Sequence, residues 1–155
     1  MRDDLVKRLD FMDMQIGALD ERIEELREEY PELESILDMY GMGVYTGLLI
    51  IGEIGDVERF RTPRQVGAYA GLTARVNQSG GHCYHGHITK QGSNWLRWAL
   101  VQVAMRVIKG DTKLANFYSR IRKRSSSKIA RVAVARKLAE ICWKRLRSWH
   151  RRNAS

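Results

Sequence analysis

The chain has 155 residues, an apolar share of 44% and a formal net charge of +9, which limits it to one ordinary domain plus an appendage. Its longest apolar run, residues 44–52, is about half the length that spans a bilayer, and a charged amphipathic stretch follows the first residues in place of a signal peptide. These features and the two cysteines, Cys83 and Cys142, exclude a membrane-spanning or disulfide-rich secreted protein and indicate a cytoplasmic one.

A helix with a heptad seam is predicted at the start of the chain. Its apolar residues follow one another at alternating steps of four and three: Leu5, Leu9, Met12, Ile16, Leu19, Ile23, Leu26 and Tyr30. A period of 3.5 residues is typical of a coiled coil, and Pro31 ends the run. We expect residues 1–31 to pair subunits, as a dimer or tetramer, or to form an interdomain stalk. The alternative is an amphipathic helix that packs on its own chain, and the flanking charges do not decide the orientation of the coil.

Short helices separated by glycines are expected next. One should cover about 32–39 and break at Gly41-Met42-Gly43, and another should cover 44–54. Thr62-Pro63 then supplies an N-cap with proline at the first helical position, and Gly71 should close that short helix.

The helical pattern fails from Leu72 to Gly92, where we expect one long glycine-rich loop in which a short hairpin could form. Ser93 should cap a central core helix to about residue 109, because apolar side chains, Trp95 and Trp98 among them, cover most of its circumference. Asp111 should cap the next helix. The predicted fold class is all-α (mainly helical): a coiled-coil helix at 1–31, a compact helical domain at 32–150 with helices near 111–122 and 128–149, and a tail at 151–155.

Charge is segregated along the chain. Residues 1–58 contain 16 of the 18 acids and 5 of the 27 bases, which gives −11, whereas residues 59–155 contain the other 22 bases and only Asp111 and Glu140, which gives +20. An excess spread over a whole folded region fits a polyanion, because each neutralised phosphate releases counterions. Nucleic acid is the expected partner, ahead of a solvated basic surface or a membrane-surface helix bundle.

The turn Tyr40-Gly41-Met42-Gly43 has the layout of a helix-hairpin-helix DNA-binding element. Two glycines around one apolar residue allow a tight turn and leave N–H groups free at a helix start, where a phosphate can bind without sequence being read. An ordinary helix–helix turn has the same spacing, but the basic remainder of the chain favours DNA. Gly41 and Gly43 are therefore candidate phosphate-binding residues.

Ser79-Gly80-Gly81 is the candidate catalytic element. A serine followed by two glycines can expose its hydroxyl and let a phosphate approach the backbone closely, although most such triplets are only flexible turns. A hydroxyl is a poor nucleophile near neutral pH, so it needs a base, a metal or stabilisation of the charge that it attacks. Side chains suited to that stabilisation follow closely: His82, His85, His87, Lys90 and Arg97.

No metal site is expected in this chain. The histidines and the cysteine of residues 82–87 crowd one short loop, whereas a structural zinc site needs four ligands, usually as two separated pairs. Histidines that face a phosphate are the preferred interpretation. The basic part offers only Asp111 and Glu140, which are interpreted as a helix cap and a helix-surface ion-pair partner, so a two-metal site cannot be assembled.

A series of motifs occurs in a defined order: Gly41-Met42-Gly43, Gly55-Asp56, Phe60, AYAGLT at 68–73, QSGG at 78–81, GHITKQG at 86–92 and Leu96-Arg97. Together they resemble the carboxyl-terminal transposase domain of the insertion-sequence 110 family, prokaryotic transposases also described as bridge-RNA-guided recombinases. The resemblance covers about 33–147. The heptad helix corresponds to the coiled coil that joins two domains in the family, and Tyr40 stands where the family usually has proline.

The resemblance implies that Ser79 attacks DNA and forms a covalent phosphoserine link that later gives strand exchange. It also implies a second, ribonuclease-H-like domain whose Asp-Glu-Asp-Asp quartet holds Mg²⁺. This chain lacks that quartet, so we expect a fragment or a separately encoded half that is incomplete on its own. The implied partners are DNA and a guide RNA, in a prokaryotic cytoplasm at the nucleoid.

The full hypothesis is a serine-recombinase half-site on a helical scaffold. The N–H groups of Gly80 and Gly81, with Lys90 and Arg97, would stabilise the transferring phosphate. Further nucleic-acid contacts are expected from Arg75, His87 and the basic face of the last helix, namely Arg136, Lys137, Lys144 and Arg145. The alternative is a non-catalytic nucleic-acid-binding and dimerisation module of the helix-hairpin-helix type.

Overall fold

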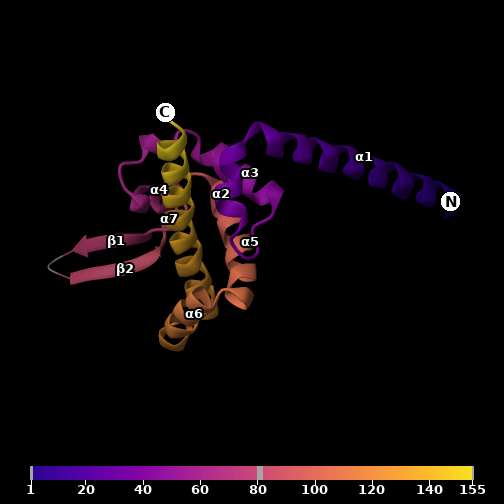
Figure 1. The fold of residues 1–155 in the computed structure, drawn as a ribbon. Helices are drawn as coiled ribbons and strands as arrows, with labels where there is room; N and C mark the ends of the chain where they lie inside the picture. Colours follow the sequence, from indigo (N-terminus) through magenta and orange to yellow (C-terminus); the bar gives the residue numbers. More distant parts are fainter. Residues whose placement is uncertain (1, 80–81, 155) are drawn as a thin grey trace. The chain divides into compact units, whose positions relative to one another are not determined.

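The computed structural model describes residues 2–79 and 82–154, with the backbone alone for 75–79 and 82–87. It contains two compact units, Met1–Pro31 and Glu32–Ser155 (Figure 1). Among the described residues, no helix combines the length and the apolarity needed to cross a membrane.

The first unit is one helix, α1 (Arg2–Glu29), and none of its residues is buried. Its heptad residues are largely open: Leu5, Leu9 and Ile16 are each more than half exposed. Ion pairs between neighbouring turns, such as Arg8 with Asp4 at 3.4 Å, line the polar side of the helix. The predicted helix is confirmed, and its pairing as a coiled coil stays a prediction.

The second unit is mainly helical, which confirms the predicted fold class. Its elements are η1 (Pro31–Leu33), α2 (Glu34–Leu37), α3 (Val44–Ile54), η2 (Val57–Arg59), α4 (Pro63–Tyr69), β1 (Ala74–Ser79), β2 (His82–Ile88), α5 (Asn94–Gly110), α6 (Thr112–Arg124) and α7 (Ser127–Asn153). Two elements differ from the sequence expectation. The helix expected near 32–39 is a 3₁₀ turn followed by four α-helical residues, and α7 continues to Asn153, into the predicted tail. The loop expected at 72–92 contains the short hairpin that the sequence allowed.

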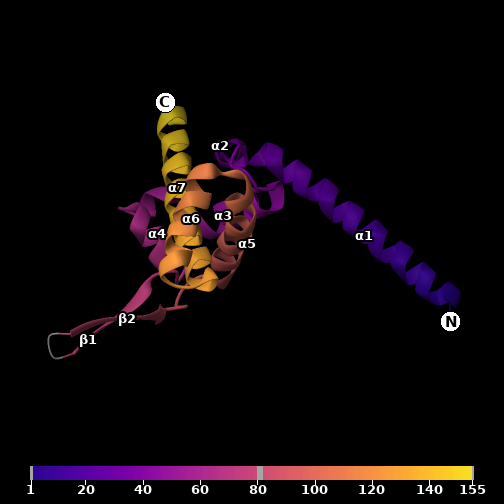
Figure 2. The ribbon, with the colours of Figure 1, turned by 90° about the horizontal axis from the view of Figure 1, so that it is seen from below.

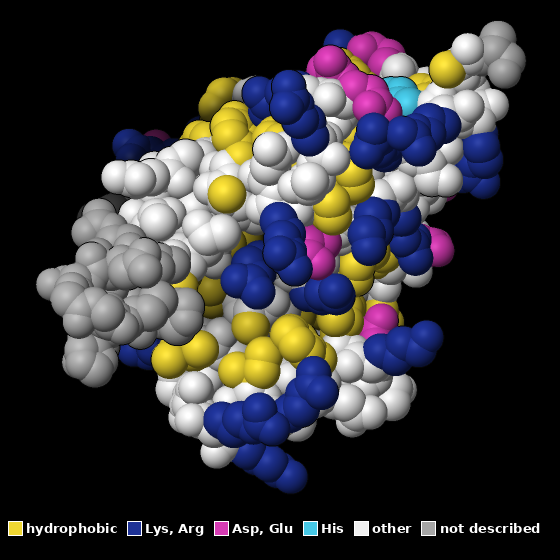
Figure 3. Space-filling view, turned by 90° about the vertical axis from the view of Figure 1, so that its left-hand side faces the viewer, with side chains coloured by type: hydrophobic (Ala, Val, Ile, Leu, Met, Phe, Trp, Pro, Cys, Tyr) yellow, Lys and Arg dark blue, Asp and Glu magenta, His cyan; other side chains and the backbone are white. Residues whose placement is uncertain are grey.

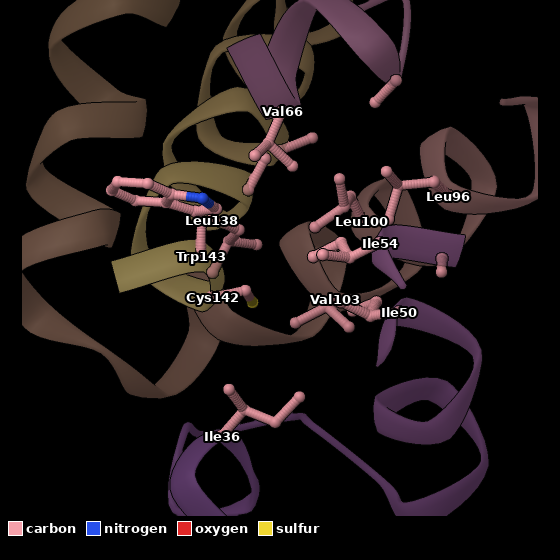
Figure 4. Packing of buried hydrophobic residues seen from close by; sticks show 14 of the residues in the cluster. Ile36, Ile50, Ile54, Val66, Leu96, Leu100, Val103, Leu138, Cys142 and Trp143 are labelled. Carbon is pink, nitrogen blue, oxygen red and sulfur yellow. The ribbon is translucent and has the colours of Figure 1, made fainter. Parts of the chain in front are cut away.

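The core forms around α7 together with α5, which buries Leu96, Leu100 and Val103 against α3, α6 and α7. The 27-residue α7 packs against α2, η2, α4, α5 and α6, and Figures 1 and 2 show α5 and α6 beside it. Figure 4 shows Leu138 and Cys142 of α7 among apolar side chains from the other helices, such as Leu100 and Ile54. Because α7 is long, side chains along it can pack against several helices of the unit.

The helix α5 buries only part of its apolar surface. Leu96, Leu100 and Val103 are fully buried, whereas Trp95 is 62% and Trp98 is 45% exposed. The expectation that both tryptophans belong to the core is therefore wrong. A helix that is apolar around most of its circumference gives no periodic signal for which side faces the solvent.

The predicted helix caps are confirmed because they depend on local chemistry. The Ser93 and Asp111 side-chain oxygens accept from the N–H groups of Leu96 and Leu114, each at 2.9 Å. Thr62 opens α4 through a capping box, with proline at the first helical position. Each cap satisfies N–H groups that a helix start leaves without an intrahelical acceptor.

Trp143 joins α7 to the segment before α4. Its indole Nε1–H donates to the buried carbonyl oxygen of Val57 at 3.0 Å, and the Arg147 guanidinium lies over its ring at 4.8 Å. Arg147 in turn forms a two-point ion pair with Glu58 at 3.0 and 2.9 Å. Together these interactions hold η2 on α7: the Trp143–Val57 hydrogen bond is buried, and the Arg147–Glu58 ion pair is more exposed.

Trp143→Phe is expected to lower the free energy of unfolding by about 1–3 kcal/mol, because the Val57 carbonyl loses its donor while remaining buried. Urea denaturation followed by circular dichroism would measure the change. Trp149→Phe is the matched control on the same helix: this ring is only partly buried, so its replacement should stay within about 0.5 kcal/mol. Equal effects of the two substitutions would contradict a specific role for the indole N–H.

Candidate nucleic-acid interface

The hairpin places the backbone of Ser79 at the end of a strand. Strands β1 and β2 pair antiparallel, with Asn77 opposite Tyr84 and Ser79 opposite His82, and both ribbon views show the pair extending outward from the helices of its unit (Figures 1 and 2). Gly80 and Gly81 lie outside the described residues, as does the side chain of Ser79. Two adjacent glycines are a hairpin signal that the sequence contained, although neither flanking segment has the regular alternation of a strand.

The hairpin is irregular near its base. Ala74 pairs with Ile88, but the next pair is Val76 with His85, so β2 has one residue more than β1 over this stretch. Gly86 and His87 thus lie opposite Arg75, in the two-against-one arrangement of a β-bulge, which bends a strand and increases its twist. The side chains of Arg75 and His87 are outside the described ones.

Beyond the bulge, residues 69–73 and 89–97 are joined by backbone hydrogen bonds. We call these two segments the clasp. The Thr89 N–H donates to the Thr73 carbonyl oxygen at 2.9 Å, and the Ser93 N–H donates to that of Tyr69 at 2.9 Å. Between them, the N–H of Lys90, a residue with a positive φ of 53°, reaches the Gly71 carbonyl at 3.2 Å. The clasp joins the end of α4 to the start of α5.

Side chains of α3, of α5 and of the α5 N-cap Ser93 complete the clasp. The Arg97 guanidinium donates to the Ala70 carbonyl oxygen at 3.0 Å and also bonds the Asn94 side chain. The Ser93 hydroxyl donates to Glu53 of α3 at 2.6 Å. Lys90 and Arg97 were the two cations expected to hold a phosphate here. The Arg97 guanidinium already forms hydrogen bonds within the clasp, whereas the Lys90 side chain is exposed.

The clasp requires glycine at position 92. Gly92 has a φ of +108°, and a Cβ there would overlap the Tyr69 carbonyl. The close approach of these two backbones is what allows the Ser93–Tyr69 hydrogen bond.

The four basic residues expected on α7 divide into two kinds. Arg145 donates to the Ser35 carbonyl at 3.1 Å and pairs with Asp38, and Lys137 pairs with Glu140 at 3.3 Å. Arg136 and Lys144 are exposed, and within the described part of the chain no carboxylate lies within ion-pair distance of either. These two cations are therefore the ones with unsatisfied charge.

Carboxylates of the second unit are used for internal contacts. Asp38, Glu53, Glu58 and Glu140 each bond a side chain of the basic part, and Asp111 caps α6. Residues 32–155 still carry a net charge of +14. Figure 3 shows the result on one face, where dark blue Lys and Arg side chains are widespread and magenta ones are few.

The two glycines of the expected helix-hairpin-helix turn have different surroundings. Gly41 has a φ of +82°, and a Cβ there would come within 2.5 Å of the Arg106 Cβ, so this glycine lets the turn pack closely on α5. Gly43 precedes α3 and has open space around its Cα. Phosphate binding at Gly41 and Gly43 and a helix-hairpin-helix function stay predictions.

Sequence reasoning missed one exposed side of α5, which we call the α5 edge: Trp95, Trp98, Gln102, Met105, Arg106 and Lys109. The last four residues line a cavity of about 400 Å³ together with Ile108, Tyr118, Ser127 and Arg131. The signal was present, because members of the edge recur at helical spacing, but neighbouring apolar residues concealed it.

The described residues supply no metal centre, since no three of their His, Cys, Asp or Glu side chains form a group that could hold an ion. The expectation for residues 82–87 concerns side chains that are not described. Burial raises the pKa of the Cys142 thiol to about 12. A thiolate nucleophile at this position is therefore excluded near neutral pH.

Comparison with known proteins gives a consistent assignment. The chain matches the model of the transposase IS116/IS110/IS902 family over residues 33–119. It is similar to a probable family 20 transposase of Pseudomonas aeruginosa, with 28% identity over 90% of this chain and 43% of that protein. It is also similar to the transposase for insertion sequence element IS1328 of Yersinia enterocolitica, with 31% identity over 90% of this chain and 45% of the relative. The chain thus spans less than half the length of these relatives.

Gly92→Ala should lower the free energy of unfolding by about 1–3 kcal/mol, because alanine is strained at this φ and its Cβ would push the Tyr69 carbonyl away. Chemical denaturation would measure the loss. Gly52→Ala is the matched control: Gly52 is an exposed residue within α3 with nothing near its Cα, so alanine should stabilise the helix by about 0.5–1 kcal/mol. A Gly92→Ala protein as stable as the parent would contradict the clasp geometry.

Proposed function

Because the chain belongs to the transposase IS116/IS110/IS902 family, we propose that it is the DNA-binding catalytic part of an insertion-sequence transposase, with Ser79 as nucleophile. The family match spans the clasp and the hairpin. The observation that carries the proposal is the position of Ser79 at the end of a hairpin whose base is fixed on a domain with a large cationic excess. A nucleophile for a backbone phosphate needs both accessibility and surrounding positive charge.

The proposed step is a transesterification at phosphorus. The Ser79 hydroxyl loses its proton to a general base as its oxygen bonds the phosphorus, and the bond from phosphorus to one sugar oxygen breaks. That sugar oxygen takes up a proton and leaves as a free hydroxyl. Reversal with a different DNA hydroxyl would release Ser79 and complete strand exchange, so the number of phosphodiester bonds is conserved.

Charge stabilisation during this step is assigned to groups of the hairpin and its base. The N–H groups of Gly80 and Gly81 would bind the phosphate oxygens. Lys90 lies at the base, roughly 16 Å along strand β1 from Ser79 at about 3.3 Å per residue, so it would bind a phosphate further along the DNA. Arg97 is assigned mainly a positioning role, since its guanidinium holds Ala70 and Asn94. Arg75 and His87 are proposed as auxiliary phosphate contacts.

The proposal leaves part of the chemistry to a partner domain. An acidic quartet that holds Mg²⁺ is expected in that domain, and the described residues of this chain form no comparable group. Guide RNA is a proposed second ligand, in a prokaryotic cytoplasm at the nucleoid. The exposed heptad residues of α1 support self-association, because water would otherwise cover a continuous apolar seam.

Ser79→Ala should abolish a covalent protein–DNA adduct while leaving DNA binding intact. The assay uses end-labelled DNA that contains a cleavable site, the full chain and the complementing acidic domain, with adducts separated under denaturing conditions. A decrease on the order of 10³-fold or more is expected when a nucleophile is removed.

Ser148→Ala is the matched control for this experiment, since Ser148 is an exposed serine of α7 away from the hairpin. It should form adduct at the parent level. If the Ser79→Ala protein still formed the adduct, Ser79 would not be the nucleophile. Retention of duplex binding without any adduct from the parent protein would favour the non-catalytic binding module.

Replacing both Arg136 and Lys144 by glutamine should weaken duplex binding and reduce the slope of log K against log salt by about 1.8, or about 0.9 for each phosphate that is no longer neutralised. Titrations at several salt concentrations would measure it. Arg145→Gln is the comparison: its guanidinium holds Ser35 and Asp38, so thermal stability should fall while the slope changes less. An unchanged slope in the double variant would show that α7 does not bind the backbone of the duplex.

A further inference from the structure

The α5 edge takes no part in the proposed Ser79 chemistry, yet it has the composition of a binding surface. Its amino-terminal half presents two exposed indoles, those of Trp95 and Trp98. Its carboxyl-terminal half presents Arg106 and Lys109, both exposed. From Trp95 to Lys109 the helix rises by about 21 Å at 1.5 Å per residue, which is long enough for several nucleotides.

The cationic half of the edge is concave. Arg106 and Lys109 line the cavity of about 400 Å³ on the α5 side, and Arg131 lines it on the α7 side. The polar residues Gln102, Tyr118 and Ser127 also line it. Such a wall can bind an anion through charge and through neutral donors together.

The positive charge of this cavity is not neutralised within the described part of the chain. Neither α5 nor α6 contains an Asp or Glu residue, and Arg106 and Lys109 have no carboxylate within ion-pair distance. The Arg131 guanidinium bonds only neutral groups, the Ser127 carbonyl oxygen at 3.3 Å and the Met105 sulfur at 3.9 Å. All three cations therefore keep their charge for an external ligand.

We infer that the α5 edge binds a single-stranded segment of nucleic acid. Unpaired bases stack on Trp95 and Trp98, and the adjoining phosphates bind Arg106, Lys109 and Arg131. Aromatic platforms beside a cationic groove are the common basis of single-strand binding, whereas the bases of a duplex have their faces covered by neighbouring pairs. Trp, Met and Arg are also common in protein interfaces, but lysine is depleted there. The three cations of the edge have no carboxylate beside them in the described part of the chain, which favours a polyanion over a protein partner.

The inference rests on the proposed nucleic-acid function but adds a second site to it. Strand exchange by Ser79 concerns a phosphate at the hairpin, whereas the edge receives unpaired DNA or RNA elsewhere on the same unit. The common chemistry is a flexible strand with accessible bases, and the choice between deoxyribose and ribose is open to direct comparison.

Tryptophan fluorescence of the full chain provides the test, since Trp143 is buried and Trp95 and Trp98 are the most exposed of the four tryptophans. Oligo-dT and oligo-U of about 15 nucleotides are titrated in parallel with a duplex of the same length. If the site does not distinguish deoxyribose from ribose, both oligo-dT and oligo-U should quench the emission. If it does, only one of them should. The duplex should leave the emission of these two indoles nearly unchanged.

Variants separate stacking from charge. Trp95→Ala and Trp98→Ala should each weaken single-strand binding about tenfold, as measured by anisotropy of a labelled oligonucleotide. Trp→Phe at either position should keep most of the affinity, because phenylalanine also stacks, while it removes that residue's quenching. Tyr45→Ala, which deletes an exposed aromatic ring of α3, is the control and should bind as the parent does.

The cations have a matched control as well. Arg106→Gln and Lys109→Gln should each reduce the salt slope for single strands by about 0.7. Lys7→Gln makes the same change in net charge on α1, outside the heptad seam, and should leave the slope unchanged.

Three results would overturn the inference: alanine variants that bind single strands like the parent, equal quenching by the duplex, or tryptophan variants whose only change is a different oligomeric state in sedimentation. The last would identify the edge as a protein interface. Failure of the Ser79 assignment would appear instead in the adduct assay, and the quenching assay requires no cleavage. The two hypotheses can therefore fail independently.

Discussion

The clasp is the constraint on which the candidate site depends. A hairpin of two strands is marginal by itself, and here its base is held by backbone hydrogen bonds between the segments after α4 and before α5. Arg97 and Ser93 connect this base to Ala70 and to Glu53 of α3. Since α4 and α5 both pack on α7, the position of the hairpin base is set by the hydrophobic core.

Electrostatics in the second unit follow from how its few acids are used. Carboxylates such as Asp38 and Glu58 bond arginines of α7 and thereby fasten α2 and η2 to the core. Arg136, Lys144 and the cations of the α5 edge have no carboxylate within ion-pair distance in the described part of the chain. The basic residues thus divide into a group that is paired within the unit and a group that is not, which total charge alone does not distinguish.

Local features were predictable from sequence, and interactions between distant segments were not. The bounds of α3 and the caps Ser93 and Asp111 depend on neighbouring residues, and they agree with the structure. The hairpin requires pairing between two segments that each lack a strong strand pattern, so a loop was the main expectation there. The partner of Arg145 lies 107 residues away, and the exposure of Trp95 depends on which side of α5 its neighbours cover. The Ser-Gly-Gly motif identified Ser79 as a candidate from the sequence, whereas its position at the end of strand β1 is known only from the structure.

Glu58 illustrates how one carboxylate can conceal a larger electrostatic effect. It holds Arg147 at two points and lies 3.9 Å from Arg151, so it masks two guanidinium groups on successive turns of α7. Loss of this acid would change the net charge by one but unmask two sites for a competing anion. It would also remove the ion pair between η2 and Arg147, so that η2 would be held on α7 by the buried hydrogen bond from the Trp143 indole to Val57. The Glu58 carboxylate therefore both attaches η2 to α7 and neutralises part of the basic surface of α7.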